Sequence, residues 1–193
     1  MDLTVGTFEE KKDRAKRMML WFGIISLVMS FAGLTSAVLV SRQREDWLQD
    51  YTMPNAFLIS CVLIVISSFT FIMAKRALKA NNRSLATTML LLTFGLGIGF
   101  ILSQLQGFNE FIVQGYNFTG PTSNVTISFI YVIAAVHILH VMAGLLSIMV
   151  VIYNHFKQKY TATDMLGVDL SATFWHFVDI LWLFLFLFLY YLA

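Results

Sequence analysis

Four residues near the end of the chain have side chains that could do chemistry within an apolar run. They are Trp175, His176, Asp179 and Trp182, and the run continues to Ala193. In a helix the spacing i, i+4, i+7 places Trp175, Asp179 and Trp182 on one face, and His176 lies one turn before Asp179. An imidazole and a carboxylate close to the inner surface of a membrane could take up protons. The alternative is a structural polar pair that fixes the register of this helix against a neighbour, because an ionisable group in lipid usually faces protein.

A second pair of histidines, His137 and His140, lies one turn apart on an earlier apolar run, with Gly144 one turn further. Paired histidines on membrane helices can ligate haem or a metal ion. In antiparallel helices, however, His140 would lie roughly 20 Å from the inner end of its helix and His176 only about 3 Å, which separates them by about 15 Å along the membrane normal. We therefore expect a hydrogen-bonded structural pair. The single cysteine, Cys61, excludes a cysteine-based zinc or iron–sulfur site within one chain. No catalytic residue, metal ligand or cofactor is predicted in this chain.

The composition requires that these residues lie in a membrane. Hydrophobic residues make up 58% of the chain, charged residues only 12%, and the mean hydropathy is +0.74. Five segments contain at most one charged residue and are long enough to span a bilayer: 18–40, 53–74, 84–108, 126–153 and 174–193. We predict an all-α membrane protein, a five-transmembrane-helix bundle that forms a single membrane domain over residues 1–193. The net charge of +2 is too small to suggest a nucleic-acid partner.

The distribution of Lys and Arg predicts the orientation of the bundle. Residues 1–17 and the second and fourth loops together contain eleven of these residues, whereas the first and third loops contain two. Cytoplasmic segments are enriched in Lys and Arg, so the N-terminus should lie inside, with residues 1–17 as a cytoplasmic segment, and the C-terminus outside. Asp164 and Asp169 are expected to precede the last helix and to suit its positive N-terminal end.

Small residues predict where these helices pack closely. Gly33 and Ala37 are spaced i, i+4 in the first apolar run, and Gly95, Gly97 and Gly99 lie in the middle of the third. Such faces allow two helix backbones to approach each other. We therefore expect a compact bundle rather than five separate helices surrounded by lipid.

The run Trp175-His-Phe-Val-Asp-Ile-Leu-Trp182 resembles the C-terminal signature of haem–copper oxidase subunit III, and His137-Ile-Leu-His-Val-Met-Ala-Gly144 resembles the family's His-x-x-His-Val-x-x-Gly. Both occur in the family's order, and the length matches the short five-helix bacterial type. The resemblance implies an accessory subunit of a terminal oxidase, such as cytochrome c oxidase, that reduces oxygen to water and pumps protons in aerobic respiration. It assigns structural or subunit-packing roles to the motif residues, which are His137, His140, Gly144, Trp175, His176, Asp179 and Trp182.

The same resemblance implies the partners and the location. Haem and copper are expected in partner subunits, subunit I is the main contact, and phospholipid is expected to bind in a cleft. The protein is expected in the bacterial inner (plasma) membrane, as a multi-pass subunit. A quinol oxidase in place of a cytochrome c oxidase stays open, as does membership of a larger respiratory supercomplex.

The chain departs from the family at two places where acidic residues are common. Leu27 follows Ile25-Ser26 where the family carries an acid within the membrane, and Gln104 and Gln106 lie where a glutamate is frequent. Roles tied to those carboxylates therefore do not carry over to this chain. The family's first two helices also have no counterpart, so the lipid cleft would be incomplete unless another chain supplies its wall.

Two other classes of protein stay open on the sequence alone. One is an independent membrane b-type cytochrome that uses His137 or His140, which an absorption spectrum would reveal. The other is a small proton-coupled transporter that uses His176 and Asp179. The lack of an internal repeat counts against the transporter.

Overall fold

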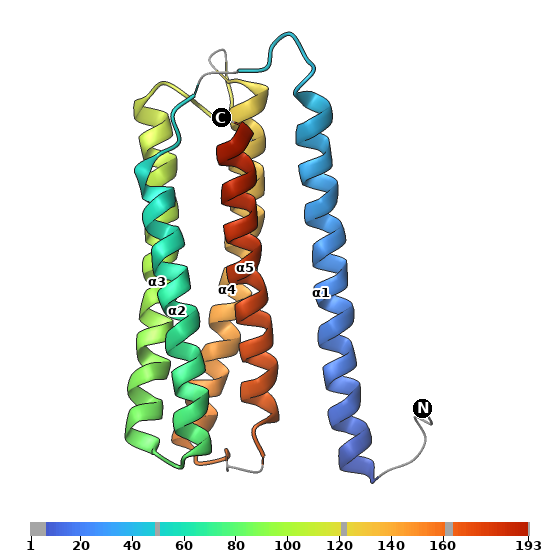
Figure 1. Ribbon diagram of the computed structural model, residues 1–193, viewed down its shortest axis with the longest axis vertical. Coiled ribbons are helices and arrows are strands. Elements are labelled where there is room, and N and C mark those ends of the chain that lie inside the picture. The colour runs from blue at the N-terminus through green and yellow to red at the C-terminus, as the bar shows by residue number, and fades with distance from the viewer. Residues whose placement is uncertain (1–6, 49–50, 121–122, 161–163, 193) are drawn as a thin grey trace.

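A computed structural model describes residues 7–48, 51–120, 123–160 and 164–192. Within these ranges the chain forms five helices: α1 (Phe8–Ser41), α2 (Asn55–Lys79), α3 (Arg83–Val113), α4 (Val125–Phe156) and α5 (Leu166–Leu192). All five are long and apolar enough to cross a membrane (Figure 1). The prediction of an all-α membrane protein with five spanning helices is therefore confirmed.

Local capping explains where three helices begin. The Thr7 hydroxyl accepts a hydrogen bond from the Glu10 backbone, and the Glu10 side chain accepts one from the Thr7 backbone, which forms a capping box for α1. Asn82 and Asn124 cap α3 and α4 with their side-chain oxygens. Asparagine is favoured here because its oxygen satisfies a backbone N–H that has no partner within the helix.

The beginning of α5 differs from the prediction. The helix starts at Leu166, before the apolar run at Phe174, and Asp169 lies within its first turn rather than before it. The carboxylate still benefits from the positive end of the helix, since the helix dipole acts over the whole first turn. Asp169 also forms ion pairs that the sequence does not reveal, which stabilise the additional turns.

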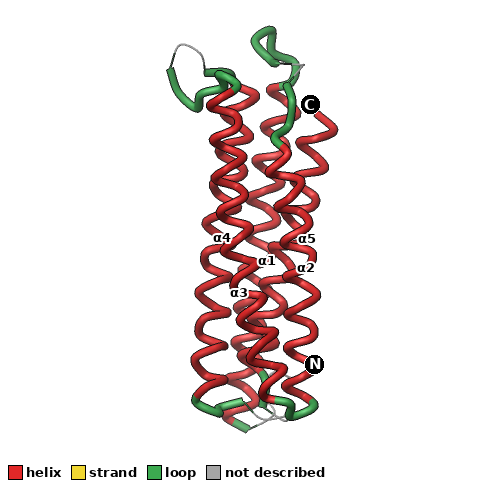
Figure 2. The backbone as a smooth tube through the Cα atoms, turned by 90° about the vertical axis from the view of Figure 1, so that its left-hand side faces the viewer, coloured by secondary structure: helices red, strands yellow, loops and turns green. Residues whose placement is uncertain are grey.

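Helices α2 to α5 pack into a bundle, whereas α1 stands apart from them (Figure 1). Seen from the side, all five run nearly parallel to one axis (Figure 2). The contact between α2 and α3 is the most extensive, and among the described residues α1 contacts only α4 and α5. Much of the apolar surface of α1 is therefore exposed, including Trp21, Phe22 and Met29.

The predicted compact packing holds for four helices and fails for α1. A Cβ atom added at Gly33 or Gly95 would meet no atom within 4 Å, whereas one added at Gly97 would lie 2.7 Å from Leu145. Of these three glycines, only Gly97 therefore accommodates a close neighbour. The prediction was wrong for Gly33 and Gly95, because α1 and α3 leave these residues exposed.

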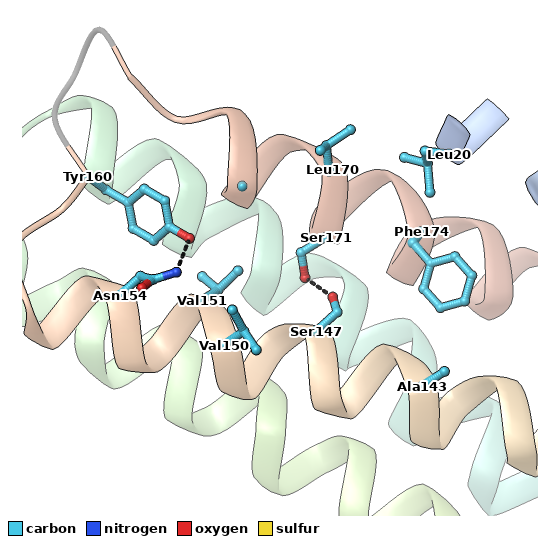
Figure 3. A pocket seen from close by; sticks show the side chains of 11 residues that line it. Leu20, Ala143, Ser147, Val150, Val151, Asn154, Tyr160, Leu170, Ser171 and Phe174 are labelled. Atoms are coloured by element: carbon cyan, nitrogen blue, oxygen red, sulfur yellow. Dashed lines mark hydrogen bonds between the residues drawn. The ribbon is translucent and has the colours of Figure 1, made fainter. Parts of the chain in front are cut away.

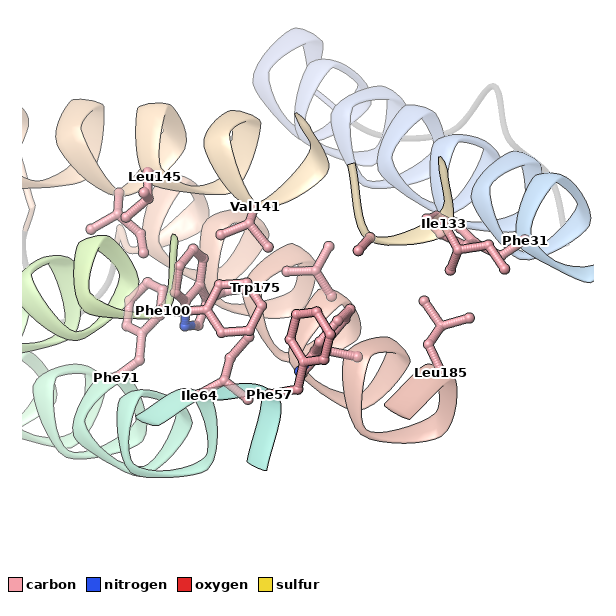
Figure 4. Close-up of a cluster of buried hydrophobic side chains, with 14 of the residues drawn as sticks. Phe31, Phe57, Ile64, Phe71, Phe100, Ile133, Val141, Leu145, Trp175 and Leu185 are labelled. Carbon is pink, nitrogen blue, oxygen red and sulfur yellow. The ribbon is translucent and has the colours of Figure 1, made fainter. Parts of the chain in front are cut away.

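Large apolar side chains fill the centre of the bundle (Figure 4). Phe57, Phe71 and Phe100 are buried between α2, α3 and α5, and Phe31 of α1 reaches the same cluster. This core holds the polar residues of the two sequence motifs at fixed positions.

Candidate functional site

Trp175 joins four helices at the centre of the bundle. Its indole N–H donates a hydrogen bond to the Ser67 hydroxyl of α2 at 2.9 Å. The ring fits against two glycines, since a Cβ atom would lie 2.8 Å from it at Gly97 of α3 and also 2.8 Å at Gly144 of α4. Gly144 lacks a side chain, and this leaves the space that the Trp175 ring occupies.

Trp182 repeats this arrangement two turns further along α5. Its indole N–H donates to the Ser60 hydroxyl at 3.1 Å, and the Gln104 side-chain amide donates to the same oxygen at 2.7 Å. The Ser60 hydroxyl in turn donates to the Phe57 carbonyl at 2.7 Å. One serine thus links α2, α3 and α5, and Gln104 serves as a structural donor.

His137 lies inside the apolar core against Trp182. The two rings stack with centroids 5.0 Å apart, and the edges of Phe31 and Phe100 enclose the imidazole. His137 is 0% exposed, and neither ring nitrogen has a hydrogen-bond partner among the described residues. The predicted hydrogen-bonded histidine pair is therefore wrong for His137, because aromatic contacts hold this ring instead.

His140 has a different environment from His137. Its Nδ1 atom lies 2.7 Å from the carbonyl of Val136 in its own helix, and its ring contacts Phe31 of α1 at a centroid distance of 5.7 Å. The two histidines and Phe31 form the contact between α1 and the bundle at mid-length. His140 therefore contributes to the packing of α1 against α4.

The predicted vertical distance between His140 and His176 needs correction. Because Trp175 lies against Gly144, the level of His176 on α5 corresponds to residue 143 on α4, which is about one helical turn from His140. The prediction of 15 Å assumed that the last helix begins at Phe174, whereas it begins at Leu166. Direction, and not depth, separates the imidazoles, because His176 faces α2 and His140 faces α1.

His176 and Asp179 both lie near Ser68 of α2. The His176 Nδ1 atom is 2.5 Å from the Ser68 hydroxyl, and the ring packs against Phe71. Asp179 is 2% exposed, and neither of its carboxyl oxygens makes a hydrogen bond within the described residues. The expected satisfied polar pair is therefore wrong for Asp179, because only His176 makes a hydrogen bond to Ser68.

Two ion pairs lie at the end of the bundle where α1 and α5 begin, which is the lower end in Figure 1. The Lys75 ammonium group lies 2.7 Å from the Asp169 carboxylate, and the Arg17 guanidinium lies 3.7 Å from its other oxygen. These pairs connect α2 and α1 to α5. The sequence analysis missed Lys75 and the α2 serines, although Ser60, Ser67 and Ser68 stand out as polar residues within an apolar run.

A pocket of about 460 Å³ lies between α1, α4 and α5 (Figure 3). Its walls are mostly apolar, with Leu20, Val150 and Phe174 among them. It adjoins a second pocket of about 540 Å³ at the lower end, which is lined by charged residues, including Lys12, Lys16, Lys159, Glu9, Asp13 and Asp164. Tyr160 and Asn154 border both pockets. The two pockets together form one groove with an apolar part and a charged part.

No group of three or more His, Cys, Asp or Glu residues could hold a metal ion in the part of the chain that the structure describes. Several polar side chains of the core, such as Ser60, Ser67 and Gln104, instead connect helices. The arrangement can therefore fix the packing of α2 to α5, and it places one carboxyl group beside one imidazole.

Comparison with known proteins places this arrangement in a family. The family model for cytochrome c oxidase subunit III matches residues 46–193. Subunit 3 of the cytochrome bo(3) ubiquinol oxidase of Buchnera aphidicola subsp. Schizaphis graminum is 29% identical over 175 residues, which cover 89% of this chain and 90% of the relative. Cytochrome c oxidase subunit 3 of Thermostichus vulcanus is 31% identical over 174 residues, covering 88% of this chain and 84% of the relative. The chain therefore belongs to the cytochrome c oxidase subunit III family, the accessory third subunits of haem–copper oxidases.

Proposed function

We propose that this chain is the non-redox subunit that supports the catalytic subunit I of a respiratory oxidase in the bacterial inner membrane. The observation that carries the proposal is the use of the motif residues. Trp175 and Trp182 bind serines of α2, His137 lies between aromatic rings, and Gly144 makes room for an indole. These residues build a rigid bundle, and haem and copper belong to partner subunits.

Geometry gives no support to the two other classes. A b-type cytochrome needs an imidazole nitrogen that can reach haem iron, whereas His137 is enclosed by rings and His140 bonds to its own helix. A transporter needs a substrate path, which is commonly built from broken helices. The helices of the described ranges are continuous.

In this proposal, the distribution of Lys and Arg determines how the chain is oriented in the membrane. The end of α2 and the start of α3, which lie at the lower end of Figure 1, carry Lys75, Arg76, Lys79 and Arg83 and would face the cytoplasm. A cysteine placed at Asn117 should then react with an impermeant reagent in intact cells, and one placed at Asn81 should not. The reverse pattern would overturn the orientation.

The groove between α1, α4 and α5 supports the proposal of a bound phospholipid. Its apolar part fits acyl chains, and the charged part carries both signs, as a zwitterionic headgroup requires. A neighbouring subunit would complete the outer wall. Lipid extraction and mass spectrometry of the purified complex would identify the lipid.

The electron donor of the complex is either cytochrome c or a quinol. Relatives named for each type of oxidase match this chain at similar identity. The donor therefore has to be identified from the other subunits. Larger respiratory assemblies would appear in the same purification.

Purification in a mild detergent tests the proposal directly. Subunit I should copurify with this chain, and removal of this chain should leave the haem and copper content of the remaining complex unchanged. Initial oxygen reduction should persist, with lower stability or progressive inactivation during turnover. Loss of a stoichiometric haem or copper with this chain would refute the assignment.

A further inference from the structure

Asp179 is a buried carboxyl group without an ionic partner in the described structure. It is 2% exposed, and neither oxygen has a hydrogen-bond partner there. The nearest cation along the α2–α5 contact, Lys75, pairs with Asp169, which lies ten residues or about 15 Å earlier on α5. An ionised carboxylate in such an apolar site would lose its hydration with no compensating charge.

The groups around Asp179 can be named on every packed element. Its own helix contributes His176 and Asp169, α2 contributes Lys75, Ser68 and the Cys61 thiol, and α1 contributes Arg17, which pairs with Asp169. In the described parts of α3 and α4, the titratable group of the central core is His137, which lies on the Trp182 side. No cation among them is available to a charged Asp179.

We infer that Asp179 is a proton-binding site within the membrane, where its carboxyl group is held as the neutral acid. The Ser68 hydroxyl is close enough to interact with it and lies 2.5 Å from His176 Nδ1. The neutral acid would donate to the Ser68 oxygen, and the Ser68 hydroxyl would donate to His176 Nδ1. Each of these three groups then uses a donor or acceptor that it possesses, and no charge is buried.

The surroundings of the site give it one route for proton exchange. Towards the upper end, the rings of Trp182, Phe57 and Phe100 close the core. Towards the lower end, His176 contacts Ser68, and the partly exposed pair of Lys75 and Asp169 lies two helical turns below this contact. Protons therefore reach Asp179 from the lower end through His176 and Ser68, and the site stores a proton rather than passing it across the membrane.

Isotope-edited infrared spectroscopy of the purified complex tests the inference. Wild type and Asp179→Asn are each prepared with and without aspartate labelled with ¹³C at the carboxyl group, and the double difference isolates Asp179. We expect a carbonyl band of a protonated acid at neutral pH. A signal only among the ionised carboxylate bands would overturn the inference. If Asp179→Asn assembles poorly, Asp179→Glu provides the same subtraction and keeps an acid in place.

Exchange into heavy water tests the route. The Asp179 band should shift in D₂O, and His176→Phe should slow this shift by roughly tenfold or more, because a positioned imidazole relays protons efficiently. An unchanged rate would refute the route through His176. The infrared band and its exchange rate both report on Asp179 alone, so they do not depend on which oxidase contains the chain. An error in the proposed partner subunits would appear in the copurification experiment instead.

Discussion

The substitution Gly144→Ala tests the central packing of the bundle. In the wild type the Trp175 ring occupies the space beside Gly144, and a Cβ atom there would lie 2.8 Å from one ring atom and 3.0 Å from the next. The ring cannot move away easily, because its other side faces Gly97 and its N–H is bonded to Ser67. The added methyl group therefore has to push a helix or break that hydrogen bond.

The expected cost follows from the rigidity of this contact. Overpacking of a well-packed core destabilises by roughly 1–3 kcal/mol. For a chain of this size, this corresponds to a decrease in Tm of a few degrees up to about 10 °C. The matched control is Gly95→Ala, because a Cβ atom at Gly95 meets nothing within 4 Å and alanine favours a helix. This control should leave Tm unchanged or slightly higher.

The temperature at which this chain dissociates from the purified complex provides the assay. Gly144→Ala should lower it, and adding Trp175→Phe should recover part of the loss, since the smaller ring leaves room for the methyl group. A positive coupling in this double-mutant cycle would locate the effect in the Trp175 contact. If Gly144→Ala is as well tolerated as Gly95→Ala, the close packing around Trp175 is refuted.

Three further substitutions test individual contacts. Ser67→Ala should lower the dissociation temperature, because it leaves the buried Trp175 N–H unpaired at a cost of roughly 1–2 kcal/mol; an unchanged temperature would contradict this role. Burial raises the pKa of Tyr51, which donates to the Leu189 carbonyl, to about 12. The unfolded chain would therefore ionise first, so stability should fall between pH 10 and 12, and Tyr51→Phe should weaken that dependence in a pH series of thermal melts. Thr7→Ala should cost α1 about 1 kcal/mol by removing the capping box, and faster amide hydrogen exchange confined to the first turn would reveal it.

The sequence predicts the number and kind of the helices because membrane spans leave a strong signal in composition. A run of about 20 apolar residues matches the thickness of the hydrocarbon layer, and the five runs each correspond to one helix. The ends of the helices are less predictable. Leu166 to Thr173 are helical although Asp169 interrupts their apolar character, because Lys75 and Arg17 neutralise that carboxylate from other helices. Such partners are distant in the sequence.

The candidate site could be predicted only in part for a related reason. The spacing of His176 and Asp179 places them one turn apart, and the structure adds that His176 contacts Ser68 of α2. The spacing does not reveal which helix they meet. Nor does it reveal that His137 lies against Trp182, so a hydrogen bond was expected where the structure has a stacked ring. Contacts between helices depend on their relative register, which no single segment contains.

The register between α2 and α5 provides a physical reason for the spacing of the C-terminal motif. Trp175 and Trp182 are seven residues apart, and so are their acceptors, Ser67 and Ser60. Residues seven apart lie on nearly the same side of a helix, two turns from each other. Two antiparallel helices can therefore form the same Trp–Ser contact at two levels. The same spacing of seven separates Ser68 from Lys75 on α2 and Asp169 from His176 on α5, and each serine or lysine contacts its counterpart on the other helix. A sliding of α5 by one turn would break all four contacts together, and therefore the motif specifies one alignment of the bundle, with Asp179 fixed inside it.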